Sequence, residues 1–279
     1  MTNLQAKDQR TKARAFRALH ERKHAFIIPN PWDAGTARLL AQLGFEALAT
    51  TSAGFAFSLG QADNTVSRAR MMEHLETVVA ATPLPVSADL ENGFGDSPDT
   101  VAETIRLAAA AGVVGGSIED ATARPKDPIY ASDLAVERVR AAVAAARGLP
   151  FPFTLTARCE NFLTGRPDLA DTIRRLQAYQ EAGADVLYAP GLSTGEEIAA
   201  VVRSVDRPVN VVMGLRGVRL GLAELSALGV RRVSVGSALA RAALGAFHRA
   251  ATEMKERGTF DFAAGAMSMK DLSGRFAST

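Results

Sequence analysis

The chain has 279 residues, of which 47% are hydrophobic and 22% charged, with 32 Lys+Arg against 30 Asp+Glu and a formal net charge of +2. These proportions are typical of a globular protein with ample apolar surface to bury. The near balance of charge and the lack of a long basic run argue against nucleic acid as a partner. The single cysteine, Cys159, excludes an intramolecular disulfide framework and a multi-cysteine zinc cluster.

No segment of the sequence has the features of a secretion signal or a membrane anchor. The first 22 residues are polar and charged, without an apolar core, and no uninterrupted run of about 18 apolar residues occurs. We therefore expect a cytoplasmic protein that does not bind a membrane.

Short apolar runs recur along the chain. Each is followed by a polar or glycine-containing turn and then by a longer segment with helical spacing of apolar residues. Most of the runs lack polar alternation, which is typical of parallel strands that helices cover on both faces. The expected strands are, in chain order, Ala25–Asn30, Ala47–Ser52, Pro85–Leu90, Gly115–Asp120, Phe153–Arg158, Asp185–Pro190, Pro208–Met213 and Arg231–Gly236.

The segments between these strands have the composition of helices. Thr100–Ala111, Leu134–Ala146 and Leu169–Ala182 are rich in Ala, Leu, Arg and Glu. Eight strand–helix units without a dividing linker predict a single (β/α)8 TIM barrel over residues 1–279, with a short N-terminal helical extension and a C-terminal tail. An open doubly wound sheet is the alternative, but the first strand ends in Pro29-Asn30-Pro31-Trp32-Asp33, which lacks the glycine-rich turn that holds a dinucleotide.

Functional side chains gather at the carboxyl ends of the predicted strands, where barrels place their active sites. Asp89 and Glu91 lie at the end of the third strand, and Glu119 and Asp120 end the fourth. Four carboxylates in one cleft require a cation, and oxygen ligands without histidine or cysteine suit Mg²⁺ or Mn²⁺. The four histidines lie outside the predicted strand ends, so zinc is not indicated.

Three larger side chains at the strand ends each leave two interpretations open. Arg158 can form an ion pair with Glu119 or Glu160, or it can clamp a substrate carboxylate through its bidentate guanidinium. Trp32 and Tyr188 can pack near the barrel mouth or contact the substrate.

Several motifs resemble those of the isocitrate lyase and phosphoenolpyruvate mutase superfamily. The strongest is Asp89-Leu90-Glu91-Asn92-Gly93-Phe94-Gly95, which is similar to the family's Asp-x-Asp/Glu-x-Gly-Tyr/Phe-Gly metal signature. Ser58–Asp63, Ser117–Asp120 and Thr156–Glu160 match further motifs. The resemblance covers most of the chain, from about residue 16 to about residue 248.

The resemblance implies a role for each residue of the acidic cluster. Asp89 would ligate Mg²⁺ directly, Glu91 and Glu119 would hold its waters, and Asp63 would complete the acidic surround. The chemistry implied is the stabilisation of an enolate of a 2-oxo acid while a C–C or P–C bond is made or broken. A Lewis acid beside oxyanion donors suits that chemistry independently of the resemblance.

The resemblance also implies how the substrate is held. Arg158 would bind a substrate carboxylate, and the turn at residues 51–53 would donate hydrogen bonds to the 2-oxo acid end. With the strand-end candidates added, the expected substrate contacts are Trp32, Thr51, Ser52, Ala53, Asp89, Arg158 and Asn210.

The loop after the fourth strand departs from both branches of the superfamily. Residues 121–130 lack the cysteine that the lyase branch carries there, and the gate of the mutase branch is also missing. No lysine ends a predicted strand to form a Schiff base, and Lys126 in this loop is the nearby candidate. The expected catalytic residues are Arg158, Glu119, Tyr188 and Lys126, and the general acid is left open among Tyr188, Glu160 and Lys126.

These observations predict a Mg²⁺-dependent lyase or decarboxylase that makes or breaks a C–C bond of a small 2-oxo or 2-hydroxy dicarboxylic acid. Two alternatives stay open: a P–C bond mutase or hydrolase of the phosphonopyruvate type, and a barrel that binds a 2-oxo acid without turnover. The expected partner is that small acid. The resemblance implies a homotetramer, or a homodimer, in which the terminal helix at about Ala238–Arg257 swaps onto a neighbouring barrel.

Overall fold

Eight short parallel strands form one sheet in the order β1-β8-β7-β6-β5-β4-β3-β2. The computed structural model describes residues 3–215 and 218–277. A hydrogen bond from Ala49 N to Pro29 O, 3.1 Å long, links the two edge strands, so the sheet closes into the (β/α)8 TIM barrel that the sequence predicted. The strands are β1 Phe26–Ile28, β2 Leu48–Ala49, β3 Val86–Asp89, β4 Gly115–Glu119, β5 Thr154–Arg158, β6 Val186–Tyr188, β7 Val209–Val212 and β8 Arg232–Ser234.

Each strand lies inside the apolar run predicted for it, and the parallel register aligns the ends of neighbouring strands. Asp89 of β3 lies opposite Ser117 of β4, and Glu119 of β4 lies opposite Arg158 of β5. Three functional side chains from three successive strands therefore meet at the carboxyl end of the barrel.

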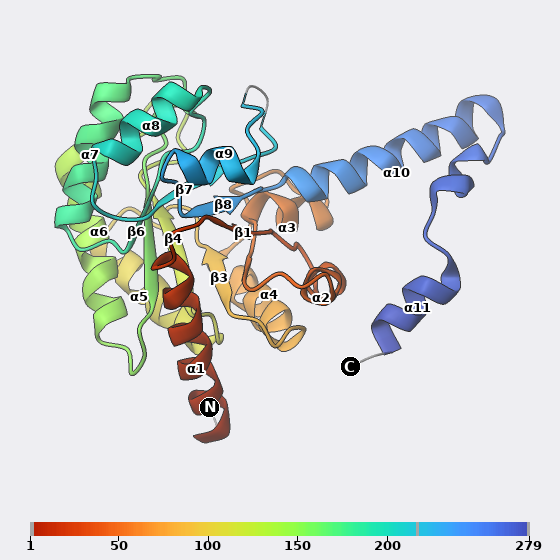
Figure 1. Ribbon diagram of the computed structural model, residues 1–279, viewed down its shortest axis with the longest axis horizontal. Coiled ribbons are helices and arrows are strands. Elements are labelled where there is room, and N and C mark those ends of the chain that lie inside the picture. The colour runs from red at the N-terminus through yellow and green to blue at the C-terminus, as the bar shows by residue number, and fades with distance from the viewer. Residues whose placement is uncertain (1–2, 216–217, 278–279) are drawn as a thin grey trace.

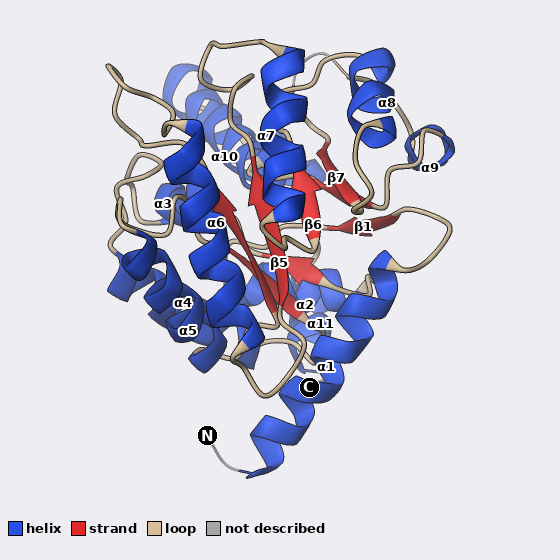
Figure 2. Ribbon diagram, turned by 90° about the vertical axis from the view of Figure 1, so that its left-hand side faces the viewer, coloured by secondary structure: helices blue, strands red, loops and turns tan. Residues whose placement is uncertain are grey.

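Helices cover the outside of the barrel, as Figure 2 shows. The helices predicted at 100–111, 134–146 and 169–182 are confirmed as α5, α6 and α7. Local capping explains where α5 begins, because the Ser97 side chain accepts a hydrogen bond from Thr100 N and Pro98 occupies the first turn. The helices between strands are α2 Ala34–Gln42, α3 Ser52–Ser58, α4 Arg68–Ala80, α5 Pro98–Ala110, α6 Ser132–Arg147, α7 Leu169–Glu181, α8 Gly195–Arg203 and α9 Leu222–Ala227.

The expected N-terminal helical extension is α1, Asn3–His20, and it packs against the amino end of the barrel. Phe16 is fully buried there, and a Cβ atom at Gly115 would lie 2.8 Å from its ring. The side chain of Gln9 donates to the carbonyl oxygens of Ala109 and Val113. These contacts cover the end of the barrel opposite the carboxyl ends of the strands.

The C-terminal part of the chain forms a long helix and a return segment. α10, Ala238–Arg257, extends away from the barrel in Figure 1 and ends at Gly258, whose φ of +64° suits glycine. The expected C-terminal tail follows α10 and contains a short 3₁₀ helix, Asp261–Gly265, and α11, Met269–Ala277. The Gln42 side chain of α2 donates to Arg275 O, which fastens α11 to the barrel. Within the described residues, no helix has the length and apolarity needed to cross a bilayer.

Candidate active site

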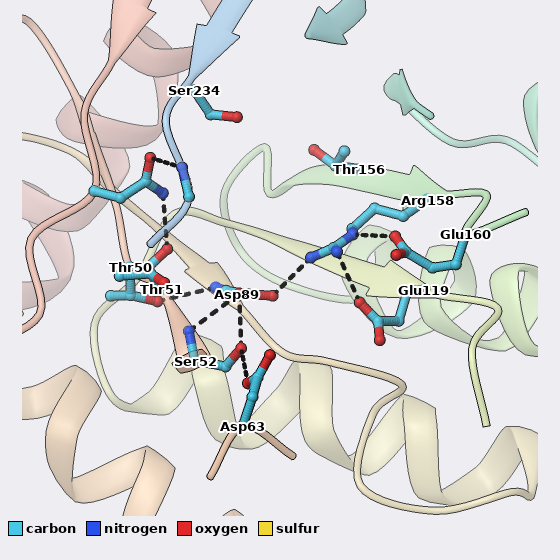
Figure 3. Close-up of polar contacts among 12 residues, drawn as sticks. Thr50, Thr51, Ser52, Asp63, Asp89, Glu119, Thr156, Arg158, Glu160 and Ser234 are labelled. Carbon is cyan, nitrogen blue, oxygen red and sulfur yellow. Dashed lines mark hydrogen bonds and ion pairs between the residues drawn. The ribbon is translucent and has the colours of Figure 1, made fainter. Parts of the chain in front are cut away.

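The end of β3 and the start of α3 hold the first part of the site. Ser52 begins α3, and both its backbone N–H and its hydroxyl lie within hydrogen-bond distance of Asp89 Oδ2, at 3.1 and 3.0 Å. The hydroxyl also lies 3.3 Å from Asp63 Oδ1, from the loop between α3 and α4. Thr51 serves as the N-cap of α3, and its Oγ1 accepts from Gly54 N. A helix N-terminus and a hydroxyl therefore point at one carboxylate, as Figure 3 shows.

Arg158, at the end of β5, forms the centre of the site. Its guanidinium lies 3.0 Å from Asp89 Oδ1, 3.0 Å from Glu119 Oε2 and 2.8 Å from Glu160 Oε1. Figure 3 shows the guanidinium between these three carboxylates. Only 14% of its side chain is exposed, and its other face lies 5.1 Å from the ring centroid of Tyr188. The ion-pair interpretation of Arg158 therefore holds with Glu119 and Glu160 and extends to Asp89.

Burial governs the electrostatics of this cluster. Burial raises the pKa of Glu119 well above its ordinary value, against the opposing effect of Arg158. Burial likewise raises the pKa of Glu160 and of Asp63. For Arg158, burial alone would lower the pKa, but Glu119, Glu160 and Asp89 together raise it well above its ordinary value. The cluster thus holds more carboxylates than its one arginine neutralises.

Glu91 provides the clearest sign that a cation fits here. Its side chain is buried, with 7% of the residue exposed, and its Oε1 atom has no hydrogen-bond partner among the described residues. Burial, followed by repulsion from Asp89 and Asp63, raises its pKa to about 8. Its φ of +50° is a conformation that non-glycine residues rarely adopt and that tends to occur at functional sites. A hard cation would relieve both the repulsion and the unpaired oxygen.

The arrangement suits a metal that keeps much of its water. Among the described residues, no three side chains of histidine, cysteine, aspartate or glutamate converge closely enough to bind one ion together. Mg²⁺ commonly takes one or two protein carboxylates and fills the other positions with water and substrate oxygens. Asp89, with Glu91, Asp63 and Glu119 around it, fits that pattern.

A pocket of about 380 Å³ opens beside the cluster, a size suited to a small organic acid. It lies at the carboxyl end of the barrel, where loops after β2, β4 and β5 form its walls. Its lining residues are Ser52, Asp63, Asn64, Glu119, Ala121, Ala123, Arg124, Pro125, Pro128, Arg158, Glu160, Leu163 and Thr164.

Asp120 departs from the acidic cluster in which it was expected. Its carboxylate is buried on the other side of the strand, where it accepts hydrogen bonds from Tyr179 Oη at 2.6 Å and from Glu160 N at 2.8 Å, and it pairs with Arg175 at 3.2 Å. Successive residues of a strand point to opposite faces, so Glu119 and Asp120 cannot both face the pocket. Asp120 supports the loop after β5.

Other sequence candidates also lie away from the pocket wall. Asn210 is buried in the barrel interior, where its side chain donates to Ser234 Oγ and accepts from Arg232 Nε. Tyr188 is buried behind Arg158, and burial raises its pKa above the ordinary value. Trp32 is half-buried, packed near Gly54. Lys126 is exposed on the loop after β4, so it does not line the pocket.

Sequence reasoning did not single out Arg124, which lines the pocket from the same loop. The only signal for it in the sequence was its place two residues before Lys126. A loop residue shows no strand or helix periodicity, so which of the two cations faces the pocket depends on the path of the loop.

The sequence matches the model of the phosphoenolpyruvate phosphomutase family over residues 16–255. The chain belongs to this family, in the isocitrate lyase/PEP mutase superfamily. This phosphomutase-family chain is 32% identical to 2,3-dimethylmalate lyase of Eubacterium barkeri over 227 residues, which are 78% of this chain and 77% of the relative. It is 30% identical to oxaloacetate decarboxylase of Paraburkholderia xenovorans over 237 residues, 82% and 76% of the two chains.

Solved structures of the superfamily have the same fold as this phosphomutase-family chain. A Burkholderia cenocepacia J2315 protein assigned as a lyase/mutase is 69% identical and superposes with a TM-score of 0.96 over 98% of each chain. A phosphonopyruvate hydrolase in complex with oxalate and Mg²⁺ is 26% identical, with a TM-score of 0.84 over 95% of this chain and 96% of the other. Members of this superfamily thus act on small dicarboxylates or phosphonates.

Proposed function

We propose that this protein is a Mg²⁺-dependent lyase or decarboxylase that breaks or makes a C–C bond of a small 2-oxo or 2-hydroxy dicarboxylic acid through an enolate. The observation that carries the proposal is the Arg158 guanidinium set among Asp89, Glu119 and Glu160 beside the N-terminus of α3. Relatives named as a dimethylmalate lyase and an oxaloacetate decarboxylase support C–C chemistry.

Each group at the pocket floor has a task in this proposal. Arg158 binds the carboxylate of the 2-oxo acid end, because a guanidinium matches a carboxylate in two parallel hydrogen bonds. The Ser52 N–H and hydroxyl, which donate to Asp89 Oδ2, orient that carboxylate toward the metal. Mg²⁺, held by Asp89 with Glu91, Glu119 and Asp63 in support, would act as a Lewis acid toward the substrate oxygens.

A proton must be held near the carbon at which the bond changes. Glu119 and Glu160 both line the pocket, and burial raises the pKa of both carboxyl groups. We assign the proton to Glu160, because Glu119 supports the metal and a raised pKa keeps a carboxylic acid protonated nearer to neutral pH. Tyr188 and Lys126 do not line the pocket, and they are not part of the proposal.

The test is turnover by the purified protein with Mg²⁺ and a panel of dicarboxylic acids, with ¹H NMR to follow products and the exchange of pyruvate methyl protons in D₂O. We expect cleavage of at least one acid and measurable exchange, and both should disappear in the Arg158→Met variant. Absence of cleavage and exchange in the unaltered protein would refute the lyase proposal. Phosphonopyruvate followed by ³¹P NMR is a parallel arm, and P–C bond cleavage there without C–C cleavage would favour the phosphonate alternative.

We also propose that the chain assembles as a homotetramer or homodimer through α10. Several large apolar side chains of this helix are exposed, namely Leu239, Leu244, Phe247 and Met254. In Figure 1 the helix extends away from the barrel instead of lying on it, so a neighbouring barrel can cover these side chains. Light scattering should give two or four times the chain mass, and Phe247→Glu should lower it. A monomer in the unaltered protein would refute the proposal.

A further inference from the structure

The pocket wall carries a second cation besides Arg158. Of the lining residues that the structure describes, only Arg158 and Arg124 are positively charged. Arg158 is largely buried at the floor, whereas 47% of the Arg124 side chain is exposed at the rim. Arg158 already pairs with three carboxylates of the protein, so we expect it to bind one carboxylate of a ligand and not two. A ligand with a second acidic group would find its counter-charge at Arg124.

The loop after β3 contacts the Arg124 guanidinium through its NH1 atom. Its NH1 atom lies 2.9 Å from both carboxylate oxygens of Asp96, in the loop after β3. Asp96 also accepts a hydrogen bond of 2.6 Å from Tyr130 Oη, and the guanidinium lies 5.6 Å from the Tyr130 ring centroid. The NH2 atom is 3.6 Å from Asp127, beyond hydrogen-bond distance. Among the described residues, no acceptor lies within hydrogen-bond distance of Nε or NH2 of Arg124, so a ligand at these donors competes only with the longer ion pair to Asp127.

Contacts that do not involve the Arg124 side chain join the two ends of the loop. Thr122 N donates to Pro128 O, and the Thr122 hydroxyl donates to Asp127 O. An isolated bridge pairs Ala121 with Ile129. These backbone contacts close the base of the loop, so replacing the guanidinium removes a charge from the pocket without opening the loop.

The remaining wall suits a carbon chain between two charged ends. Ala121, Ala123, Pro125, Pro128 and Leu163 all line the same pocket, and none has a polar side chain. An acid whose 2-oxo end lies at Arg158 would pass its methylene groups along this apolar surface. A carboxylate at its other end would then reach the rim.

We propose that Arg124 is the residue that selects dicarboxylic acids, by binding the distal carboxylate of the substrate with Nε and NH2 while Asp96 holds NH1. The inference rests on the proposed function, since it assumes that the 2-oxo acid end binds at the floor of the pocket. A planar guanidinium presents two parallel donors to a carboxylate, which a 2-oxo acid without a distal carboxylate cannot use. Arg124 thus sets specificity and takes no part in the bond change.

The test compares two ligands of equal chain length, 2-oxoglutarate and 2-oxovalerate, by calorimetry in the presence of Mg²⁺. Oxalate serves as a third ligand that occupies only the floor. We expect the unaltered protein to bind 2-oxoglutarate at least about 10-fold more tightly than 2-oxovalerate. Hydrogen bonds to a charged group typically give a gain in affinity of this size. Arg124→Gln should bring this ratio close to one and leave the dissociation constant of oxalate within about twofold. Arg124→Lys keeps the positive charge but loses the two parallel donors of the guanidinium. It should therefore retain part of the preference for 2-oxoglutarate over 2-oxovalerate.

Arg70→Gln is the matched control, because Arg70 is also an exposed arginine in an ion pair, with Glu73 on α4. The ratio of the dissociation constants of 2-oxovalerate and 2-oxoglutarate in this variant should equal that of the unaltered protein. If Arg124→Gln keeps the preference for 2-oxoglutarate, the role of Arg124 is refuted. If the unaltered protein binds oxalate but does not distinguish the two longer acids, the inference fails while the proposed function stands. If no ligand binds in the presence of Mg²⁺, the proposed function fails and the inference fails with it.

Discussion

Arg158 and Asp89 form an ion pair across the barrel mouth, with NH1 of the first 3.0 Å from Oδ1 of the second. The same carboxylate receives two hydrogen bonds from Ser52 through its other oxygen. Asp89 therefore connects the cationic part of the site with the helix N-terminus. A metal bound to Asp89 and a substrate carboxylate bound to Arg158 would be neighbours, which brings the reacting end of the substrate against the Lewis acid.

The geometry of Arg158 should matter more than its charge. Arg158→Lys keeps a cation but cannot reach Asp89, Glu119 and Glu160 at once, because an ammonium group lacks the planar fork. We expect kcat/KM on the best dicarboxylate to fall about 100-fold, the size of loss that follows from a misplaced reacting group. Steady-state kinetics would check this, and a loss below about threefold would contradict it.

Glu91 should influence metal binding without being needed for folding. Glu91→Gln removes a buried carboxyl group whose Oε1 atom has no partner among the described residues. We expect Mg²⁺ affinity to fall about 10- to 100-fold, as is common when a residue supporting a metal ligand is replaced. Titration calorimetry with Mg²⁺ would measure it. Glu76→Gln, on the exposed side of α4, is the control, and equal affinity in the two variants would exclude Glu91 from the metal site.

His74 should make the fold sensitive to acid. Its ring stacks on Phe55 at 3.8 Å, and burial lowers its pKa from 6.5 to about 4, although Asp33 acts in the opposite direction. Between these two values the unfolded chain binds the proton and the folded chain does not, so stability is full above pH 6.5 and falls as the pH decreases toward 4. The loss attributable to this residue is of the order of 3 kcal/mol.

His74→Phe keeps the aromatic stacking and removes the titrating ring. The free energy of unfolding should therefore depend less on pH between 6.5 and 4. Urea unfolding at pH 7 and at pH 4.5 would measure the difference. His24→Gln, at an exposed histidine, should leave the profile of the unaltered protein unchanged. Parallel profiles for His74→Phe and the unaltered protein would disprove the assignment.

Asn210 should contribute to stability and little to substrate binding. Its amide links Arg232 to Ser234 inside the barrel, and the buried guanidinium of Arg232 contacts Asn210, Thr156 and His20. Asn210→Ala leaves a charged donor without its acceptor, which typically costs about 2 to 3 kcal/mol. We expect that loss in chemical denaturation, with KM within about twofold. A large rise in KM at unchanged stability would instead support the substrate contact predicted from the sequence.

The barrel could be predicted from the sequence because its signals are local. Every strand lies within an apolar run such as Pro85–Leu90, and α10 has the bounds expected for the terminal helix, Ala238–Arg257. Burial on both faces forces such runs to be apolar, whatever else surrounds them. The short helix α11 was not predicted from the sequence. None of its residues is buried, and it contacts α2. That residues 1–279 form one domain stays a prediction.

The site could be predicted only in part, and its residues show where the limit lies. The sequence by itself placed Asp89, Glu119 and Arg158 at strand ends, because parallel strands bring their carboxyl ends to one edge. It could not decide between Glu119 and Asp120, since the two side chains point to opposite faces and the phase of the strand depends on its neighbours. Nor could it choose Arg124 over Lys126, because the direction of a loop side chain depends on contacts such as that with Asp96, which is distant in sequence. Those choices were made by the tertiary structure alone.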